Sequence, residues 1–156
     1  MTRTDRRWVA MQILVVVAIV PALIVLRPPE ERLLPIRVGL ALCFISLAVM
    51  VSALVAHALV NHTPRVNVSP SPDVEKLLVV RGIYAYVRHP MYLSGSLLLL
   101  GATIWHGNVV VIGGGLMASL FFYLKAVHEE RLLLQVYADY PACMKRTGRL
   151  LPQLWR

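Results

Sequence analysis

The sequence predicts an all-α, polytopic membrane protein: a helical bundle of about four transmembrane helices with a helical tail on the cytoplasmic side. Two observations support this fold class. Of the 156 residues, 58% are hydrophobic and the mean hydropathy is +0.66, which is more apolar than an average soluble domain. The apolar residues also gather into four runs without charged side chains, as membrane-spanning helices do.

The two N-terminal runs are the longest. Residues 8–26 are apolar except for Gln12 and a proline, and residues 38–60 carry no charge. The first run is longer than the hydrophobic core of a signal peptide. Because about 20 apolar residues cross the hydrocarbon core, we expect residues 1–60 to form two transmembrane helices.

The second half of the chain predicts a transmembrane hairpin. Residues 91–105 and 109–124 are apolar runs separated by a short His-Gly-Asn turn. Each run would cover only about 22–24 Å as a helix, so the helices are expected to extend at their ends or to thin the membrane locally. The glycines at 113–115 are expected to serve close helix packing.

The basic residues predict the orientation. All but three of the 16 lie before the first run, between the second and third runs, or in the tail. The positive-inside rule therefore places both termini and the connector in the cytoplasm. The Arg-His-Pro triplet at 88–90 and the charged tail then face the same compartment, where they can meet.

The net charge of +8 fits contact with anionic lipid headgroups, because the basic residues flank apolar runs. Nucleic-acid binding is disfavoured, since no polar surface segment combines basic and aromatic residues. The five histidines and the cysteines Cys43 and Cys143 show no spacing typical of metal ligands. No metal site is predicted.

The segment GIYAYVRHPMY, residues 82–92, carries unusual polar groups next to an apolar run. Pro90 suits the first turn of a helix, which places Arg88 and His89 at the start of the third span. A helix N-terminus offers free N–H groups and partial positive charge, so a site for a carboxylate or phosphate is expected. The aromatic residues that can stack on a flat ring or a cation are Tyr84, Tyr86 and Tyr92.

The segment KAVHEER follows the fourth run. Lys125 and Glu129 are four residues apart, on one helix face. Glu129 and Glu130 point about 100° apart, so one is expected to bind a ligand while the other pairs with Arg131, Lys125 or the tail. Together with the anion site, the free carboxylate suits a zwitterionic aromatic ligand. The alternative is that these residues are ordinary anchors at the membrane interface.

The chain closely resembles the isoprenylcysteine carboxyl methyltransferase family. The resemblance lies in four features and their order: GIYAYVRHPMY, the apolar hairpin, the Glu-Glu pair and the tail segment YADYPACMKRTGRLLP. Phospholipid N-methyltransferases are related to this family. The resemblance covers residues 76–152, about half of the chain. It implies S-adenosyl-L-methionine as methyl donor and a lipophilic acceptor that enters from the membrane. The absence of a GxGxxG segment agrees with a donor site that is not a Rossmann fold.

The resemblance also implies a set of site residues. Those for the cofactor are Lys76, Leu77, Leu78, Val79, Tyr84, Arg88, His89, Pro90, Met91, Tyr92 and Glu129. The family usually has an arginine four residues before this glutamate, where it engages the substrate's carboxylate. This chain has Lys125 there, which keeps the charge but not the bidentate fork. An amine acceptor would need a base, for which Glu130 and His128 are candidates.

The prediction is a single membrane domain in four parts. Residues 1–60 form two transmembrane helices, 61–90 a cytoplasmic connector, 91–126 the hairpin and 127–156 a tail that covers the cofactor. The predicted function is methyl transfer to a carboxylate of isoprenylcysteine type; a phospholipid, small amine or thiol is the alternative acceptor.

Two other classes of protein are alternatives. A non-catalytic membrane scaffold predicts no cofactor binding and indifference to changes at His89 and Glu129. A small transporter is disfavoured, since no apolar run carries an interior charge.

Overall fold

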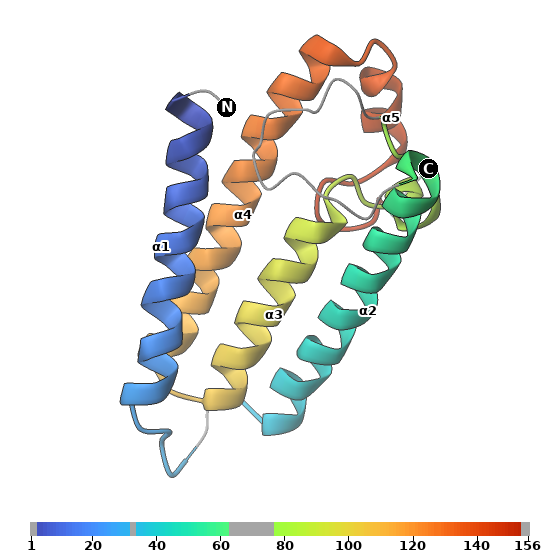
Figure 1. The fold of residues 1–156 in the computed structure, drawn as a ribbon. Coiled ribbons are helices and arrows are strands. Elements are labelled where there is room, and N and C mark those ends of the chain that lie inside the picture. Colours follow the sequence, from blue (N-terminus) through green and yellow to red (C-terminus); the bar gives the residue numbers. More distant parts are fainter. Residues whose placement is uncertain (1–2, 32–33, 63–76, 154–156) are drawn as a thin grey trace.

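The computed structural model describes residues 3–31, 34–62 and 77–153, and the regular elements of these residues are all helices (Figure 1). The predicted all-α bundle is confirmed. The elements are α1 (Arg3–Val25), α2 (Ile36–Asn61), the 3-10 turn η1 (Gly82–Ala85), α3 (Pro90–His106), α4 (Val109–Val136) and α5 (Tyr140–Arg146).

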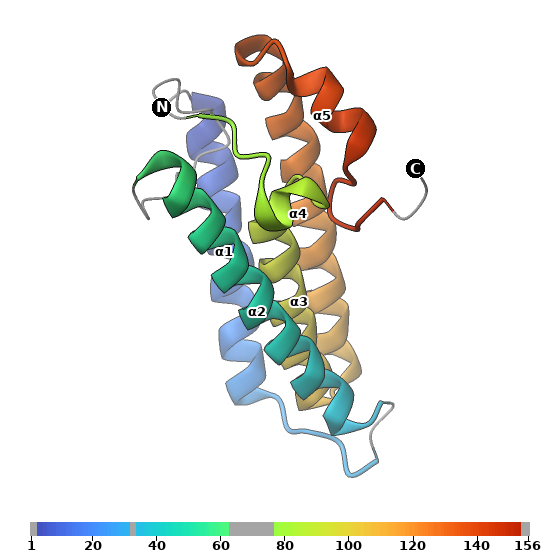
Figure 2. The same cartoon turned by 90° about the vertical axis from the view of Figure 1, so that its right-hand side faces the viewer.

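Among the described helices, α1, α2 and α4 are long and apolar enough to cross a membrane. The third predicted span, α3, has 17 residues and a length of about 26 Å. It lies beside α2 and α4 (Figures 1 and 2). The fourth predicted span continues well past residue 124, because no glycine or proline interrupts residues 116–136. At 28 residues α4 is about 42 Å long, so its last turns reach beyond a hydrocarbon core of about 30 Å.

The helices alternate in direction. The start of α1, the end of α2, the start of α3 and the end of α4 lie at one end of the bundle, together with η1 and α5 (Figure 1). We call this the connector end. As predicted, the Arg-His-Pro triplet and the charged tail contact each other at this end. The division proposed between residues 126 and 127 falls inside α4, which passes through it without a break.

Helices α2 and α3 pack backbone to backbone. A Cβ on Gly39 would lie 2.5 Å from the backbone nitrogen of Trp105, and one on Gly101 would lie 2.8 Å from the Gly39 oxygen. Two turns further on, the hydroxyl of Ser46 donates to the Ser94 oxygen at 2.9 Å, and Ser94 donates to the Ser46 oxygen at 3.0 Å. Small residues and paired hydroxyls are the usual means of close helix contact in a membrane.

Helix α4 packs on both α3 and α1. At the predicted glycine triplet, only Gly115 lies against another helix closely, since a Cβ there would lie 2.3 Å from Thr103 Oγ1. On the other side of α4, the Trp8 ring of α1 stacks on His128 at 5.3 Å and contacts Phe121 at 5.7 Å. Helix α1 is thus attached to the bundle mainly through α4.

Candidate functional site

The polar site begins where α3 begins. Pro90 occupies the first turn as predicted, and His89 is the N-cap. The His89 side chain is buried, with Nδ1 3.6 Å from Glu129 Oε2 and Nε2 3.5 Å from Glu130 Oε1. Its ring stacks on Tyr92 at 5.6 Å. The two glutamates point to different sides of α4, yet the imidazole lies between them and contacts both.

Glu130 is held by two arginines. Arg88 Nε donates to Glu130 Oε1 at 2.8 Å, while Arg149 donates to Oε2 through Nε at 2.9 Å and Nη2 at 2.6 Å. Arg149 also donates to the hydroxyl of Tyr123 at 2.8 Å. The side chains of Arg88 and Glu130 are 8% and 4% exposed. The hydrogen bonds to Glu130 raise the pKa of Arg149 above its ordinary value. Both carboxylate oxygens are therefore engaged.

Arg88 also fastens the tail. Its Nη1 donates to the backbone oxygens of Met144, at 3.1 Å, and Thr147. The Thr147 hydroxyl in turn donates to the Cys143 oxygen at 2.7 Å. The end of α5 is therefore held in place beside the Arg88 guanidinium. The Nε and Nη1 donors of Arg88 thus have one carboxylate and two backbone carbonyl partners. We call Arg88, Glu130, Arg149 and Thr147 the arginine clamp.

Backbone hydrogen bonds join the tail to the segment before α3. Gly148 N–H donates to the Tyr86 oxygen at 3.0 Å, and the Gly148 oxygen accepts from Arg88 N–H at 2.8 Å. His89 N–H donates to the Arg149 oxygen at 3.1 Å. A Cβ on Gly148 would lie 1.7 Å from the Leu151 oxygen, so the tail can follow this path only with glycine there.

The connector is fixed to the end of α2. The Asn61 side chain accepts from Leu77 N–H at 2.8 Å and donates to the Leu77 oxygen at 3.4 Å. Gly82 has φ +60, in the left-handed region that favours glycine, and a Cβ there would lie 3.2 Å from Ala56 Cβ. These contacts set the path of the chain into η1. Lys76, the first predicted cofactor residue, lies outside the described residues.

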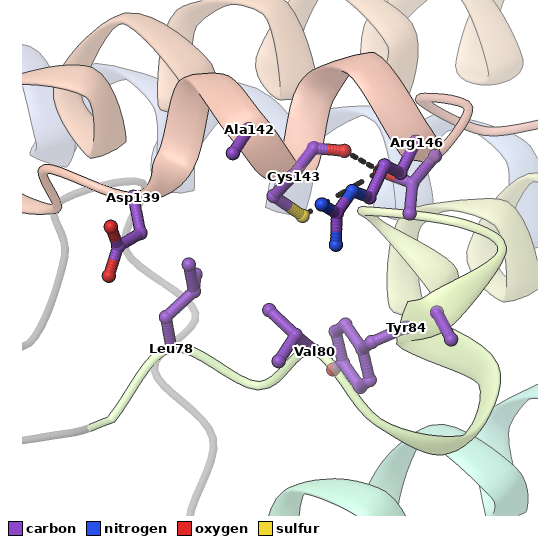
Figure 3. Close-up of a pocket in the computed structure, with 9 residues that line it drawn as sticks. Leu78, Val80, Tyr84, Asp139, Ala142, Cys143 and Arg146 are labelled. Atoms are coloured by element: carbon purple, nitrogen blue, oxygen red, sulfur yellow. Dashed lines mark hydrogen bonds between the residues drawn. The ribbon is translucent and has the colours of Figure 1, made fainter.

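A pocket of about 380 Å³ opens between the connector and α5 (Figure 3). Leu78, Val80 and Tyr84 line it from the connector, facing Asp139 and Arg146 across the space (Figure 3). The remaining lining residues are Ala85, Ala142, Cys143 and Thr147. The pocket therefore offers an aromatic ring, apolar walls, one carboxylate and one guanidinium, with a volume in the range of small-molecule sites.

Tyr84 joins the pocket to the polar groups of α4. Burial and, to a lesser extent, the Glu129 carboxylate raise the pKa of Tyr84 above its ordinary value. Tyr140, at the start of α5, is also buried, and burial together with the Glu130 charge raises its pKa. The pocket and the glutamate pair therefore lie near each other at the connector end.

Lys125 lies one turn from Glu129, on the side of α4 that faces α1. Its side chain is buried, and Nζ donates to Gln12 Oε1 on α1. Nζ also lies 5.2 Å from the centre of the Tyr92 ring, within the range of a cation–π contact. Tyr92 stacks on Phe122 at 5.9 Å. The buried lysine therefore has an amide on one helix and an aromatic ring on another among its neighbours.

The predicted cofactor residues fall into two adjoining groups. Leu78 and Tyr84 line the pocket, whereas Arg88, His89, Tyr92 and Glu129 gather around the start of α3 and the end of α4. Pro90 is buried, while Val79 and Met91 are partly exposed and the Leu77 side chain is exposed. Cofactor binding by all these residues stays a prediction.

The sequence did not single out several residues of this region. Gln12 interrupts an apolar run, and a lone amide in such a run is itself a signal. Arg149 and Thr147 lie in the tail segment, but nothing in their spacing shows that Arg149 reaches Glu130 or that Thr147 reaches Arg88. Asp139 and Arg146 reach the pocket only because α5 folds back toward the connector.

The structure thus describes a helical membrane bundle with a polar, partly buried site at one end. Residues 36–140 match the phospholipid methyltransferase family, which is more than half of the chain. The chain belongs to this family. Helix α1 and Arg149 lie outside the matched residues.

A curated relative is also similar to this chain. The protein-S-isoprenylcysteine O-methyltransferase of Schizosaccharomyces pombe is 36% identical over 73 residues. These residues are 46% of this chain and 31% of the relative. The match therefore spans less than a third of the relative's length.

Proposed function

We propose that the protein is an S-adenosyl-L-methionine-dependent methyltransferase that acts at the membrane on a lipophilic acceptor with a carboxylate. The observation that supports this most directly is the two-part site: a pocket containing Tyr84 adjoins Glu129 and His89, and Lys125 lies one helical turn deeper. Family membership supports the class of reaction, and the similar relative is named as an O-methyltransferase.

The residues fit the proposed cofactor. Leu78, Val80 and Tyr84 give the pocket a surface for a flat base, and Asp139 offers a carboxylate to hydroxyl groups. Glu129 provides a negative charge for an ammonium. His89 Nε2 is buried and makes no hydrogen bond within the described structure, and a bound ligand can supply the partner that such a buried atom needs. The residues therefore offer partners for the ring, the sugar and the charged end of this cofactor.

When bound, S-adenosyl-L-methionine supplies an electrophilic methyl group: an acceptor oxygen bonds to the methyl carbon, and the electron pair of the broken carbon–sulfur bond stays on sulfur. The protein's contribution is mainly to hold and orient the partners, which can supply much of the rate. Lys125 would hold the acceptor's carboxylate, and the aromatic rings of Tyr92 and Phe122 would keep water from the reacting atoms.

A carboxylate acceptor needs no base, because its oxygen is already ionised. Glu130 was predicted as a candidate base for an amine, but its two oxygens accept from Arg88 and Arg149. A carboxylate held in this way is a weak proton acceptor. We therefore favour a positioning role for Glu130, in which it closes the tail over the site. The cytoplasmic location of the connector end follows from the positive-inside rule and is part of the proposal.

The test is a transfer assay with purified protein in lipid nanodiscs, methyl-labelled S-adenosyl-L-methionine and an N-acylated S-prenylcysteine. The expected product carries the label as a methyl ester, so mild base releases labelled methanol. Label in phosphatidylethanolamine that resists base would show instead an amine-directed enzyme. The proposal would be contradicted if the wild type transferred label to neither acceptor and its assay could not be distinguished from that of Glu129→Ala.

A further inference from the structure

Gln12 is the one hydrogen-bonding side chain in the apolar run of residues 8–26 apart from the Trp8 ring. A lone amide in a transmembrane helix is unfavourable unless it has a polar partner. Its oxygen accepts from Lys125 Nζ, although α1 lies outside the residues that match the family. The polar partner of a proposed acceptor-binding residue therefore comes from a helix that the family match does not include.

The surroundings of this contact place it beside the proposed cofactor site. Lys125 Nζ lies 5.2 Å from the Tyr92 ring centre, and Tyr92 stacks on His89. On the α1 side, the Trp8 ring contacts Phe121 and His128. The amide and the ammonium thus meet between α1 and α4, in an apolar surrounding that suits the head of a lipophilic molecule.

We propose that Gln12 is a specificity-determining residue of the acceptor site, which selects a carboxylate and rejects an amine. This inference rests on the proposed function. Its physical basis is the set of groups that the pair presents: the Lys125 ammonium and the Gln12 NH₂ are both donors. A carboxylate can take the place of the Gln12 oxygen on Nζ and accept from the amide as well. A protonated amine would meet the like charge of Lys125, and the one acceptor of the pair, the Gln12 oxygen, already accepts from Nζ.

The variant Gln12→Glu separates this role from a purely structural one. A glutamate would pair with Lys125 and keep α1 and α4 together, so a structural role predicts an unchanged or improved protein. A specificity role predicts the reverse, because the new carboxylate competes with the acceptor for Nζ. We expect KM for the N-acylated S-prenylcysteine to rise tenfold or more, with the dissociation constant for S-adenosyl-L-methionine unchanged.

Gln12→Met removes the amide donor but keeps a side chain of similar size. We expect KM for the N-acylated S-prenylcysteine to rise several-fold, with kcat largely retained. The matched control is Gln135→Met, because Gln135 is exposed near the end of α4; its KM should equal that of the wild type. If Gln12→Met does not fold, Gln12→Glu still decides the question, since an ion pair preserves the contact.

The outcomes distinguish the two proposals. Absence of cofactor binding in the wild type would overturn the proposed function itself. Cofactor binding and methyl transfer with an unchanged KM in Gln12→Glu would overturn the role of Gln12 alone. Transfer to phosphatidylethanolamine but not to the prenylcysteine would leave a methyltransferase and overturn selection of a carboxylate.

Discussion

The two sides of the connector end of α4 differ in how their charges are used. On one side Glu130 accepts three hydrogen bonds from Arg88 and Arg149, and its side chain is 4% exposed. On the other side Glu129 is 23% exposed, lies 3.6 Å from His89, too far for a hydrogen bond, and has a neutral partner, the Tyr92 hydroxyl. Lys125, on the same face as Glu129, contacts the neutral amide of Gln12.

Under the proposed function, this difference separates structure from ligand binding within one helical turn. The arginine clamp fixes the tail against the start of α3, so it builds the wall of the pocket. The Glu129–Lys125 face keeps groups whose partners a zwitterionic cofactor and an anionic acceptor can replace. Changes on the clamp side should therefore affect folding, and changes on the other side should affect binding.

The largest effect is expected for Glu130→Ala. Removing one partner of a buried ion pair leaves Arg88 buried without its carboxylate, which typically costs about 3–5 kcal/mol. Thermal unfolding in detergent should show a large fall in the melting temperature, accompanied by loss of cofactor binding. Arg131→Ala is the control, because Arg131 is adjacent and exposed and should unfold like the wild type. A stable Glu130→Ala protein would mean that the clamp does not hold the tail.

A smaller effect, on binding alone, is expected for His89→Gln. His89 lies between the two glutamates. The His89→Gln variant therefore shows whether His89 belongs with the arginine clamp or with the Glu129–Lys125 face. We expect the affinity for S-adenosyl-L-methionine to fall about tenfold, which corresponds to about 1.4 kcal/mol. The melting temperature of the ligand-free variant should fall less than that of Glu130→Ala. Equal destabilisation of the two variants would assign His89 to the clamp.

The smallest effect is expected for Tyr84, at the edge of the pocket. Tyr84→Ala should weaken cofactor binding a few-fold, since an aromatic contact contributes about 0.5–1.5 kcal/mol. Tyr84→Phe should bind like the wild type, because the ring face and not the hydroxyl is used. Isothermal titration of both variants measures this; a loss in Tyr84→Phe as large as in Tyr84→Ala would show that the hydroxyl is the contact.

Much of the fold was predictable from local patterns. Apolar runs located the helices, because hydropathy reports on the membrane directly, and Pro90 marked the start of α3. Helix α4 extends beyond the apolar run of residues 109–124, as the short length of that run predicted, and its last turns are formed by polar residues. Helix formation there depends on the absence of breakers rather than on polarity.

The site was predictable in its members but not in its pairings. The sequence suggested that one glutamate would bind a ligand and the other would pair with the tail, and Glu130 does pair with Arg149. Which arginine it contacts depends on the path of the tail through Gly148, and that path is a tertiary property. The Gln12–Lys125 contact joins residues 113 positions apart, so no local spacing indicates it.

The most direct test of the account is calorimetric titration of the purified protein with S-adenosyl-L-methionine, beside Glu129→Ala and the exposed-site control Arg131→Ala. We predict saturable binding by the wild type and by Arg131→Ala, and none by Glu129→Ala at the same concentrations, with all three proteins melting at similar temperatures. Binding that survives in Glu129→Ala, or a folded wild type that binds no cofactor, would contradict the assignment of this face of α4 to the methyl donor.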